Sequence, residues 1–431
     1  MWKPSWPDRT PRVRTHGLAG LLRPRAGRYL PRRLRASRVG LLARDLPDGV
    51  RDPAFEELIR EIDGGSPIHE DTAIEVYFDG SRALEAMLEA VRSARWELLV
   101  ESYIFTDDST GRRFARALTR AASRGVDVRV LADAFGSFFT SDRFWREMRE
   151  GGVQVRLFHR LFRSLWWQPF RDHRKILVAD RKVAYTGGMN IANEYVTPLE
   201  KLSSEAMRDT HLRLAGAAAW ELAAVFAEGW SRSGGPPLPL DEPPDDRPGN
   251  RKVLVLDSRP GRGHRETAAV LAASIAAARR SVWLTNGYFA PGRPAVRHLG
   301  EVAGRGVDVR LLLPGITDVP VIRHAGHGWY GRLLREGVRI FEYQPAILHA
   351  KTLIVDEYLS IVGSTNLDFR SFRFNAECNA VILDPEIGRI LARGFRRDLE
   401  RSVEIEEDSW HRRSLPHRIV DRAAGILTPL L

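Results

Sequence analysis

One spacing pattern occurs twice in this chain and limits what the chain can fold into. In HRKILVADRKVAYTGGMN (173–190) a His is followed by one residue, a Lys, four residues, an Asp, six residues, a Gly, two residues and an Asn. HAKTLIVDEYLSIVGSTN (349–366) repeats these positions at the same intervals. Two matches of this length are not expected by chance, so we predict two similar structural units.

Further repeats surround both copies. ASRGVDVRVLAD (122–133) is matched by AGRGVDVRLLLP (303–314), and MREGGVQVRLF (148–158) is matched by LLREGVRIFEY (333–343). In each case we predict an amphipathic helix that ends at a Gly in the left-handed C-cap conformation, followed directly by a strand of alternating apolar residues. Because helix followed by strand recurs along the chain, we predict an α/β fold.

The repeats divide the chain into parts. WELLVESYIF (96–105) and SVWLTNGYFAP (281–291) are predicted to be the opening core strands of the two halves. GGPPLPLDEPPDDRPGN (234–250) is rich in Pro, Gly and Asp, a composition typical of a linker. The predicted parts are an Arg-rich extension over 1–65, a first half over 66–233, the linker over 234–250, a second half over 251–405 and a C-terminal tail over 406–431.

The composition suits two globular domains. The chain has 431 residues, of which 43% are apolar and 28% are charged, enough for two hydrophobic cores. The most apolar stretch, 214–230, is interrupted by Glu221 and Glu228, so we predict a core helix rather than a membrane span. Residues 1–50 lack the compact apolar segment of a secretory signal, and we expect the protein to work inside the cell. The single cysteine, Cys378, is expected to be a small buried residue.

Positive charge is concentrated at the start of the chain. Residues 1–50 contain one Lys and eleven Arg against three Asp, so this segment carries +9 of the net charge of +11. Basic residues interleaved with Trp and Leu suit an anionic lipid surface, and they also suit a nucleic acid or another anionic partner. A disordered, solvated tail is the remaining alternative.

The motif predicts a local structure. Residues two apart on a β-strand face the same side, so we expect His173 and Lys175 to share one site. The polar pair after Asp180 predicts a tight hairpin there, and we expect Asp180 to organise that turn rather than to touch a substrate. The Gly pair at 187–188 allows the backbone to approach closely, and Asn190 supplies a neutral hydrogen-bond donor.

Two copies of the motif imply two imidazoles, two ammonium groups and two carboxamides that meet across a pseudo-twofold axis. Such groups suit a phosphodiester, because Lys and Asn donors can stabilise the charge of its transition state without a metal. One His can attack phosphorus and form a phosphohistidine while the other protonates the leaving oxygen. The predicted catalytic residues are His173, Lys175, Asp180, His349, Lys351 and Asp356, and the predicted phosphate-binding residues are Asn190, Ser364 and Asn366.

The sequence favours no metal site. It contains one Cys, and His173 and His349 lack the close spacing of a helical His pair. For the paired motifs, a purely structural role or an inactive site of unchanged shape is the alternative. The other histidines interpreted as structural, because the sequence identifies no partner for them, are His159, His211, His324 and His327.

Two carboxylates are candidates to orient the motif histidines. A histidine nucleophile presents one ring nitrogen while a carboxylate usually holds the other. Glu377 begins the strand that follows the second motif, and Asp209 begins the matching strand of the first half. We predict that Asp209 orients His173 and that Glu377 orients His349. The alternative is that both are ordinary carboxylates at strand edges.

The duplicated motif resembles that of the phospholipase D superfamily, over residues 70–405. The segments ESYIFTDDSTGRRF, RDTHLRLAG, NGYFAPGRPAVRHL and both motif regions are similar to the bacterial cardiolipin synthase branch, in particular its shorter members without N-terminal membrane helices. The resemblance implies two similar phospholipase D-type halves, each a mixed β-sheet flanked by helices. They would be related by a pseudo-twofold axis, with one active site at their interface.

The resemblance also implies the reaction, a ping-pong phosphatidyl transfer for which we expect no cofactor. One His takes the phosphatidyl group from a first phospholipid, typically phosphatidylglycerol, and a second phosphatidylglycerol then attacks the phosphohistidine to give cardiolipin. We take His173 as the nucleophile and His349 as the general acid. Water or another alcohol as acceptor is the main alternative. A nuclease and a non-enzymatic membrane-binding module are further alternatives.

Two apolar segments favour a lipid. LFRSLWWQPF (161–170) would dip into a membrane interface if it were exposed, and otherwise its aromatic rings fill the core. HRIVDRAAGILTPLL (417–431) would rest on the bilayer or dock on the protein. The halves after residue 50 carry little net charge and show no basic groove lined with aromatic residues. We therefore expect phospholipid substrates, peripheral attachment to the cytoplasmic face of an anionic membrane, and no nucleic-acid partner.

Overall fold

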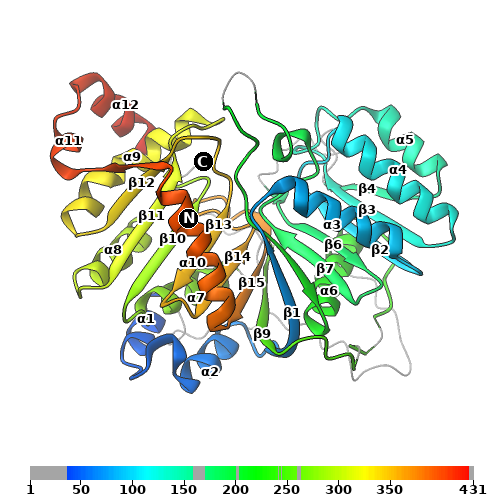
Figure 1. Ribbon diagram of the computed structural model, residues 1–431, viewed down its shortest axis with the longest axis horizontal. Helices are drawn as coiled ribbons and strands as arrows, with labels where there is room; N and C mark the ends of the chain where they lie inside the picture. The colour runs from blue at the N-terminus through cyan, green and yellow to red at the C-terminus, as the bar shows by residue number, and fades with distance from the viewer. Residues whose placement is uncertain are drawn as a thin grey trace, which may run out of the picture.

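Two halves with the same order of elements lie side by side in the computed structural model (Figure 1). The structure describes residues 36–158, 170–199, 203–240, 242–243, 245–259 and 264–426. The first half consists of β1 (His69–Tyr77), α3 (Gly80–Ser93), β2 (Glu97–Ser102), α4 (Ser109–Ser123), β3 (Asp127–Asp133), α5 (Asp142–Glu150), β4 (Gln154–Phe158), β5 (Arg171–Asp172), β6 (Lys175–Ala179), β7 (Val183–Gly187), the 3-10 helix η3 (Asn193–Tyr195), β8 (His211–Ala215) and α6 (Ala217–Arg232).

The second half repeats this order after the linker, except that its described residues form no counterpart of β5 or η3 and add one strand, β16. It consists of β9 (Arg251–Ser258), α7 (His264–Ala276), β10 (Ser281–Asn286), α8 (Arg293–Ala303), β11 (Asp308–Pro314), α9 (Pro320–Arg335), β12 (Arg339–Tyr343), β13 (Lys351–Val355), β14 (Leu359–Gly363), β15 (Asn375–Leu383), α10 (Pro385–Leu399) and β16 (Ser402–Ile405).

One mixed sheet runs through both halves. Its order is β16-β12-β11-β10-β13-β14-β15-β9-β1-β8-β7-β6-β2-β3-β4, and β5 pairs separately with β15. The core strands β2 and β10 each pair in parallel with the next strand of their half and antiparallel with the first strand of the motif hairpin. β1 and β9 pair antiparallel and join the halves. The predicted α/β fold of two similar halves is therefore confirmed.

Apolar side chains that alternate along the strands attach the helices to the sheet. In β10, Val282 and Leu284 belong to the core that includes α7 and α8, whereas Trp283 belongs to the core that includes α10. Successive strand residues point to opposite faces, so each face can hold its own helices. The first half builds the equivalent core with α3 and α4.

Local sequence signals explain where the helices begin and end. The carboxylates of Asp79 and Asp108 accept hydrogen bonds from backbone amides in the first turns of α3 and α4, as N-cap residues do. Gly125 and Gly306, the predicted C-cap glycines, have φ angles of 90° and 85°. The apolar stretch at 214–230 forms most of α6, whose many buried side chains confirm a core helix.

Segments before and after the two halves pack on the second half. α1 and α2 lie against α7, and α11 and α12 lie against α9. Within the part of the chain that the structure describes, no helix has the length and apolar character needed to cross a bilayer. These elements are α1 (Ala36–Arg44), the 3-10 helix η2 (Gly49–Arg51), α2 (Pro53–Ile62), α11 (Glu407–His411) and α12 (Leu415–Ile426).

Some predictions fall on residues outside the described ones. These residues are the basic arm up to residue 35, His159, the aromatic segment 161–170 apart from Phe170, and the end of the tail from 427. The described residues of the linker form neither helix nor strand. Cys378 is buried, as predicted.

Candidate active site

The two motif histidines lie just before equivalent strands, where the halves meet. His173 precedes β6 and His349 precedes β13, and both are buried. The backbone N–H of His173 donates to the carbonyl of Ala376 at 2.9 Å, and that of His349 donates to the carbonyl of Arg208 at 2.8 Å. Each histidine is therefore held by a backbone hydrogen bond to the opposite half.

Each histidine ring is also held by a carboxylate of the opposite half. His173 Nδ1 lies 3.0 Å from Glu377 Oε2, and His349 Nδ1 lies 2.7 Å from Asp209 Oδ2. The prediction that Asp209 orients His173 and Glu377 orients His349 was therefore wrong in its pairing. Both carboxylates do lie at the site, in exchanged roles.

The strand pairing explains this exchange. β5, just before His173, pairs in parallel with the start of β15, just before Glu377. An isolated β-bridge joins Arg208 and Leu348, the residues just before Asp209 and His349, and so places Asp209 beside the second motif. Each motif therefore starts beside the carboxylate-bearing strand of the other half. Spacing within one half could not reveal this contact, because it depends on how the halves join.

The two motif lysines lie beside the histidines and are buried. Lys175 Nζ donates to the backbone carbonyl of His173 at 2.6 Å, and Lys351 Nζ donates to the carbonyl of His349. Burial lowers the pKa of Lys175 to about 7 and the pKa of Lys351 to about 8, because removal from water outweighs the attraction of the nearby carboxylates. Burial thus disfavours the charged form of both lysines relative to the same groups in water.

Two tyrosines that the sequence analysis did not select flank the histidines. The ring of Tyr103 meets the ring of His173 edge-on at 4.9 Å between centroids, and Tyr288 meets His349 at 5.7 Å. The ammonium groups of the two motif lysines lie 5.2 and 5.7 Å from the same tyrosine rings. A signal was present in the sequence, since both predicted opening strands run into a Tyr and a Phe.

The two motif asparagines differ in their contacts. Asn190 accepts from the amide of Ile104 and donates to the hydroxyl of Tyr195 at 2.8 Å. That hydroxyl lies 3.3 Å from His349 Nδ1. The side-chain oxygen of Asn366 is buried, and among the described residues it has no hydrogen-bond partner. Asn366 therefore retains hydrogen-bonding capacity that Asn190 has already used.

The residue after the motif Gly lies behind the orienting carboxylate in both halves. Ser364 Oγ donates to Glu377 Oε2 at 2.5 Å and accepts from the amide of Cys378 at 3.0 Å. In the first half, a Cβ atom on Gly188 would lie 2.2 Å from Asp209 Oδ1, so only Gly leaves room for this carboxylate. The Ser364 hydroxyl, predicted to bind phosphate, is committed to Glu377 in the structure.

The motif aspartates lie at the far end of the hairpins. The predicted hairpin is confirmed, since β6 and β7 pair antiparallel on either side of Asp180. Asp180 accepts from the backbone amides of 95–97 at 2.9–3.0 Å, and Asp356 accepts from those of 279–281 at 2.8 Å. These two members of the predicted catalytic set therefore fix the start of a core strand, at the opposite end of the hairpin strand from the histidine.

Burial and pairing set different protonation preferences at the two histidines. Burial, with the charge of Lys175, lowers the pKa of His173 well below its usual range. Burial also lowers the pKa of His349, but the hydrogen bond and charge of Asp209 oppose the shift. Burial raises the pKa of Glu377 to about 7, whereas at Asp209 the hydrogen bond from His349 overcomes burial and lowers the pKa. The His349–Asp209 pair is thus better suited to hold a proton on the imidazole.

Comparison with solved structures places this fold among known ones. The crystal structure of phosphatidylserine synthase from Haemophilus influenzae Rd KW20 superposes with a TM-score of 0.64 at 13% sequence identity. The match covers 92% of this chain and 100% of that one. Polyphosphate kinase from Porphyromonas gingivalis superposes with a TM-score of 0.52 at 15% identity, over 88% of this chain and 55% of that one. At these identities the likeness concerns the fold alone.

Sequence comparison identifies the family. The family described as cardiolipin synthase, PLD-like domain, matches residues 87–211 and 271–399, once in each half. "Cardiolipin synthase 1" of Bacillus anthracis is 30% identical over 403 residues, which cover 90% of this chain and 78% of the relative. "Cardiolipin synthase 2" of the same organism is 33% identical over 359 residues, which cover 82% and 70%. The chain therefore belongs to the phospholipase D-like cardiolipin synthase family, a family of phospholipid-modifying enzymes.

Proposed function

We propose that the protein is a cardiolipin synthase that condenses phosphatidylglycerol with a second phospholipid, most simply another phosphatidylglycerol, and releases glycerol. The observation that carries the proposal is the pair of buried histidines, each with Nδ1 on a carboxylate of the opposite half. With Nδ1 engaged, Nε2 of each ring is left for chemistry. Exchange of one alcohol for another at phosphorus needs two such nitrogens, one to bond phosphorus and one to carry a proton.

In the proposed first step, Nε2 of neutral His173 attacks the phosphorus with its electron pair and forms a P–N bond. The P–O bond to glycerol breaks, and the Nε2–H of the His349 imidazolium gives its proton to the leaving oxygen. The products are phosphatidyl-His173, neutral His349 and glycerol. The strongly lowered pKa of His173 supports a neutral nucleophile, and the contact of His349 with Asp209 supports a proton carrier.

In the proposed second step, neutral His349 takes the proton of a hydroxyl on the second phospholipid. The oxygen attacks phosphorus, the P–N bond breaks, and its electron pair returns to His173. The buried ammonium groups of Lys175 and Lys351 supply positive charge for the phosphoryl oxygens in both steps, where low polarity strengthens the interaction. Asn366, with its unused side-chain oxygen, is proposed to hydrogen-bond the substrate.

We also propose that the protein acts as a peripheral protein on the cytoplasmic face of the membrane. The charge of +9 within residues 1–50 supports attraction to anionic lipid, at about 1 kcal/mol for each basic side chain near the surface. The proposed substrate lies in the same surface. Transfer to water, which would make the protein a phospholipase D hydrolase, uses the same two histidines and is an outcome of the test below.

The test is incubation of the purified protein with vesicles that contain radiolabelled phosphatidylglycerol, followed by separation of the lipid products. We expect cardiolipin and free glycerol from the wild type, and neither from His173→Ala or His349→Ala. His417→Ala, which changes an exposed histidine on α12, is the matched control and should retain activity. Phosphatidic acid alone would replace the proposal with a hydrolase. No turnover of lipid, together with cleavage of a nucleic acid, would replace it with a nuclease.

A further inference from the structure

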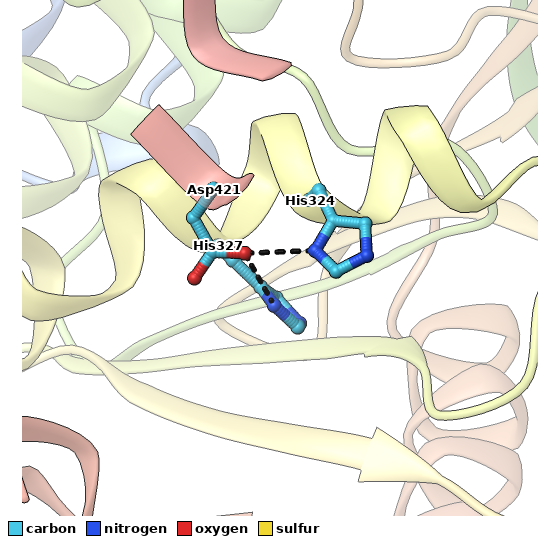
Figure 2. Close-up of side chains that lie close together, drawn as sticks. All are labelled: His324, His327 and Asp421. Carbon is cyan, nitrogen blue, oxygen red and sulfur yellow. Dashed lines mark hydrogen bonds and ion pairs between the residues drawn. The ribbon is translucent and has the colours of Figure 1, made fainter. Parts of the chain in front are cut away.

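A cluster of two histidines and a carboxylate lies outside the active site, between α9 and α12 (Figure 2). His324 and His327 lie one turn apart on α9, and Asp421 reaches them from α12. Asp421 Oδ1 lies 2.8 Å from His324 Nδ1 and 3.4 Å from His327 Nδ1. The three ligand atoms lie within 4.8 Å of one another, close enough to coordinate one ion.

The ring of His327 lies between two carboxylates, which is the second observation. Its Nδ1 faces Asp421, and its Nε2 lies 3.1 Å from Glu342 Oε1. A metal-bound imidazole has one nitrogen on the ion and the N–H of the other nitrogen directed at an acceptor. With Nδ1 on the side of Asp421 and His324, and Nε2 beside Glu342, the ring of His327 lies in that orientation. A carboxylate behind a metal-bound histidine is the usual arrangement at such sites.

The remaining surroundings indicate which ion fits. Arg413 Nη1 holds the other oxygen of Asp421 at 2.8 Å, which leaves Oδ1 directed at the two histidines. His327 is nearly buried, whereas 31% of the His324 side chain is exposed, so water can complete the coordination. Two imidazole nitrogens, one carboxylate oxygen and water match the tetrahedral preference of Zn²⁺, whereas Mg²⁺ and Ca²⁺ prefer oxygen ligands alone.

We propose that His324, His327 and Asp421 bind Zn²⁺ and that the ion attaches α12 to α9. The apolar contact that includes α12 and α9 is small and involves Ala325 and Ala424. α9 in turn packs closely on the active-site side of the second half, since a Cβ atom on Gly326 would lie 2.4 Å from the carbonyl of Phe289. The ion would thus fix the C-terminal helix to the helix that supports the Tyr288 loop.

The proposal is tested by measuring metal binding to the full chain. The protein is prepared without a histidine tag and is stripped of metal with a chelator. Zn²⁺ is titrated in competition with a chromophoric chelator, and Co²⁺ by its visible absorption. We expect one ion per chain and a tetrahedral Co²⁺ spectrum, both lost in His324→Ala and Asp421→Asn. Glu342→Gln should weaken Zn²⁺ affinity about 10–100-fold. His417→Ala, on the same helix as Asp421, should bind as the wild type does.

Amide hydrogen exchange separates loss of the site from loss of the fold. Zn²⁺ should slow exchange in α12 of the wild type but not of His324→Ala. Without metal the two proteins should differ less than with Zn²⁺, because His324→Ala then removes only the contact of His324 with Asp421, while the ring contact of His327 with Trp410 remains. Absence of stoichiometric Zn²⁺ binding in the wild type, or binding that survives both His324→Ala and Asp421→Asn, would overturn the proposal.

A different observation concerns exposed phenylalanines beside the active site. Phe135, Phe138 and Phe139 are 51%, 55% and 94% exposed, in a segment AFGSFFTS (134–141) that has no charged residue. Large apolar side chains gathered on the surface of a folded protein mark an interaction site.

The segment is fixed in place next to His173. The amide of Phe105 donates to Ser137 Oγ at 3.1 Å. A Cβ atom on Gly136 would lie 2.2 Å from the carbonyl of Tyr103, whose ring contacts His173. The phenylalanines follow the end of β3, and the proposed nucleophile precedes the start of the antiparallel strand β6, so both lie at the same end of the sheet.

We infer that Phe138 and Phe139 insert into the interface of a phospholipid bilayer and hold the proposed active site against the bilayer surface. This inference rests on the proposed lipid substrate. A bilayer is the occupant that fits, because the proposed substrate lies in that surface and the segment adjoins the residues that would receive it. Uncharged phenylalanines gain from transfer out of water into such an interface.

The test compares lipid in vesicles with lipid in solution, using Phe138→Ser/Phe139→Ser. Sedimentation with phosphatidylglycerol vesicles and turnover on them should fall about tenfold or more. Turnover of dihexanoyl phosphatidylglycerol, dissolved as monomers, should stay unchanged. Trp96→Ser, an exposed aromatic at the other end of β2, is the matched control. Unchanged vesicle binding, or equal loss on both substrates, would overturn the inference. A wild type that binds vesicles through these residues but turns over neither lipid would count against the proposed function alone.

Discussion

His173 and Glu377 are 204 residues apart in the chain, yet their Nδ1 and Oε2 atoms lie 3.0 Å apart. The second histidine repeats the relationship, because Asp209 lies on His349 Nδ1 across 140 residues. Neither half contains a complete pair of histidine and orienting carboxylate. The junction of the halves is therefore part of the candidate active site as well as part of the fold.

The roles of the two histidines can be separated by the leaving group. A p-nitrophenyl phosphodiester leaves without a proton, so His349→Ala should retain the first step on this substrate, measured as a burst of p-nitrophenol. His173→Ala should show no burst, because no nucleophile remains. On phosphatidylglycerol both variants should lose about 100-fold or more in rate, the usual contribution of acid–base groups. A burst from His173→Ala but not from His349→Ala would reverse the assignment.

Lys175→Met should stabilise the protein while it removes activity. Burial lowers the pKa of Lys175 to about 7, which means that its charged form is unfavourable in the fold. We expect the free energy of unfolding at pH 7, measured with urea, to rise by about 1–4 kcal/mol, because the cost of burying the ammonium group, which the lowered pKa reflects, is removed. Turnover of phosphatidylglycerol should fall, since the ammonium charge is lost. A less stable Lys175→Met protein would show that the charge supports the fold.

Gly188→Ala should damage the site through Asp209 alone. The added Cβ would lie 2.2 Å from Asp209 Oδ1 and must displace this carboxylate from His349. We expect turnover to fall by about 100-fold or more, as when a general acid loses its orientation. Gly40→Ala is the control, because its Cβ would meet its nearest neighbour at an ordinary 3.7 Å. Equal activity of both variants would contradict the role of Asp209.

Substitution of Asp356 should affect stability more than catalysis. Its carboxylate accepts three backbone amides at the start of β10, and its backbone has a φ of 54°. Asp356→Ala should lower the free energy of unfolding by about 2–3 kcal/mol, and Asp356→Asn by less, because Asn keeps an acceptor and tolerates positive φ. The kcat of the folded fraction should be unchanged in both. A specific fall in kcat at full stability would place Asp356 among the reacting groups.

Acid should destabilise the protein in part through His211. Burial lowers the pKa of His211 to about 4, from 6.5 in the unfolded chain. Between these values the unfolded state binds more protons, so stability falls as the pH falls from about 6.5 to 4, by up to about 3 kcal/mol. Urea unfolding at several pH values should show a shallower dependence in His211→Gln than in the control His417→Gln. If the free energy of unfolding depended on pH equally in the two variants, His211 would not be a source of the acid sensitivity.

Local patterns in the sequence determined the repeated elements. Alternation of apolar residues, the C-cap glycines and the polar pair after Asp180 depend on neighbours a few positions apart, and the structure confirms the strands, the core helix and the hairpin. The duplicated spacing also selected the histidines and lysines of the candidate site, because each copy of the motif must build the same local geometry. Asp209 and Glu377 were selected by a different signal, since each lies where the strand after its motif was predicted to begin.

Only the tertiary structure decided which half supplies the orienting carboxylate of each motif histidine. The pairing of β5 with β15 carries Glu377 to His173, and the matching bridge carries Asp209 to His349. The same folding turns Ser364 toward Glu377 and brings the strand-end tyrosines against the histidines. These contacts join residues far apart in the chain, and their geometry is set by how two folded sheets meet. No local spacing in the sequence carries that information.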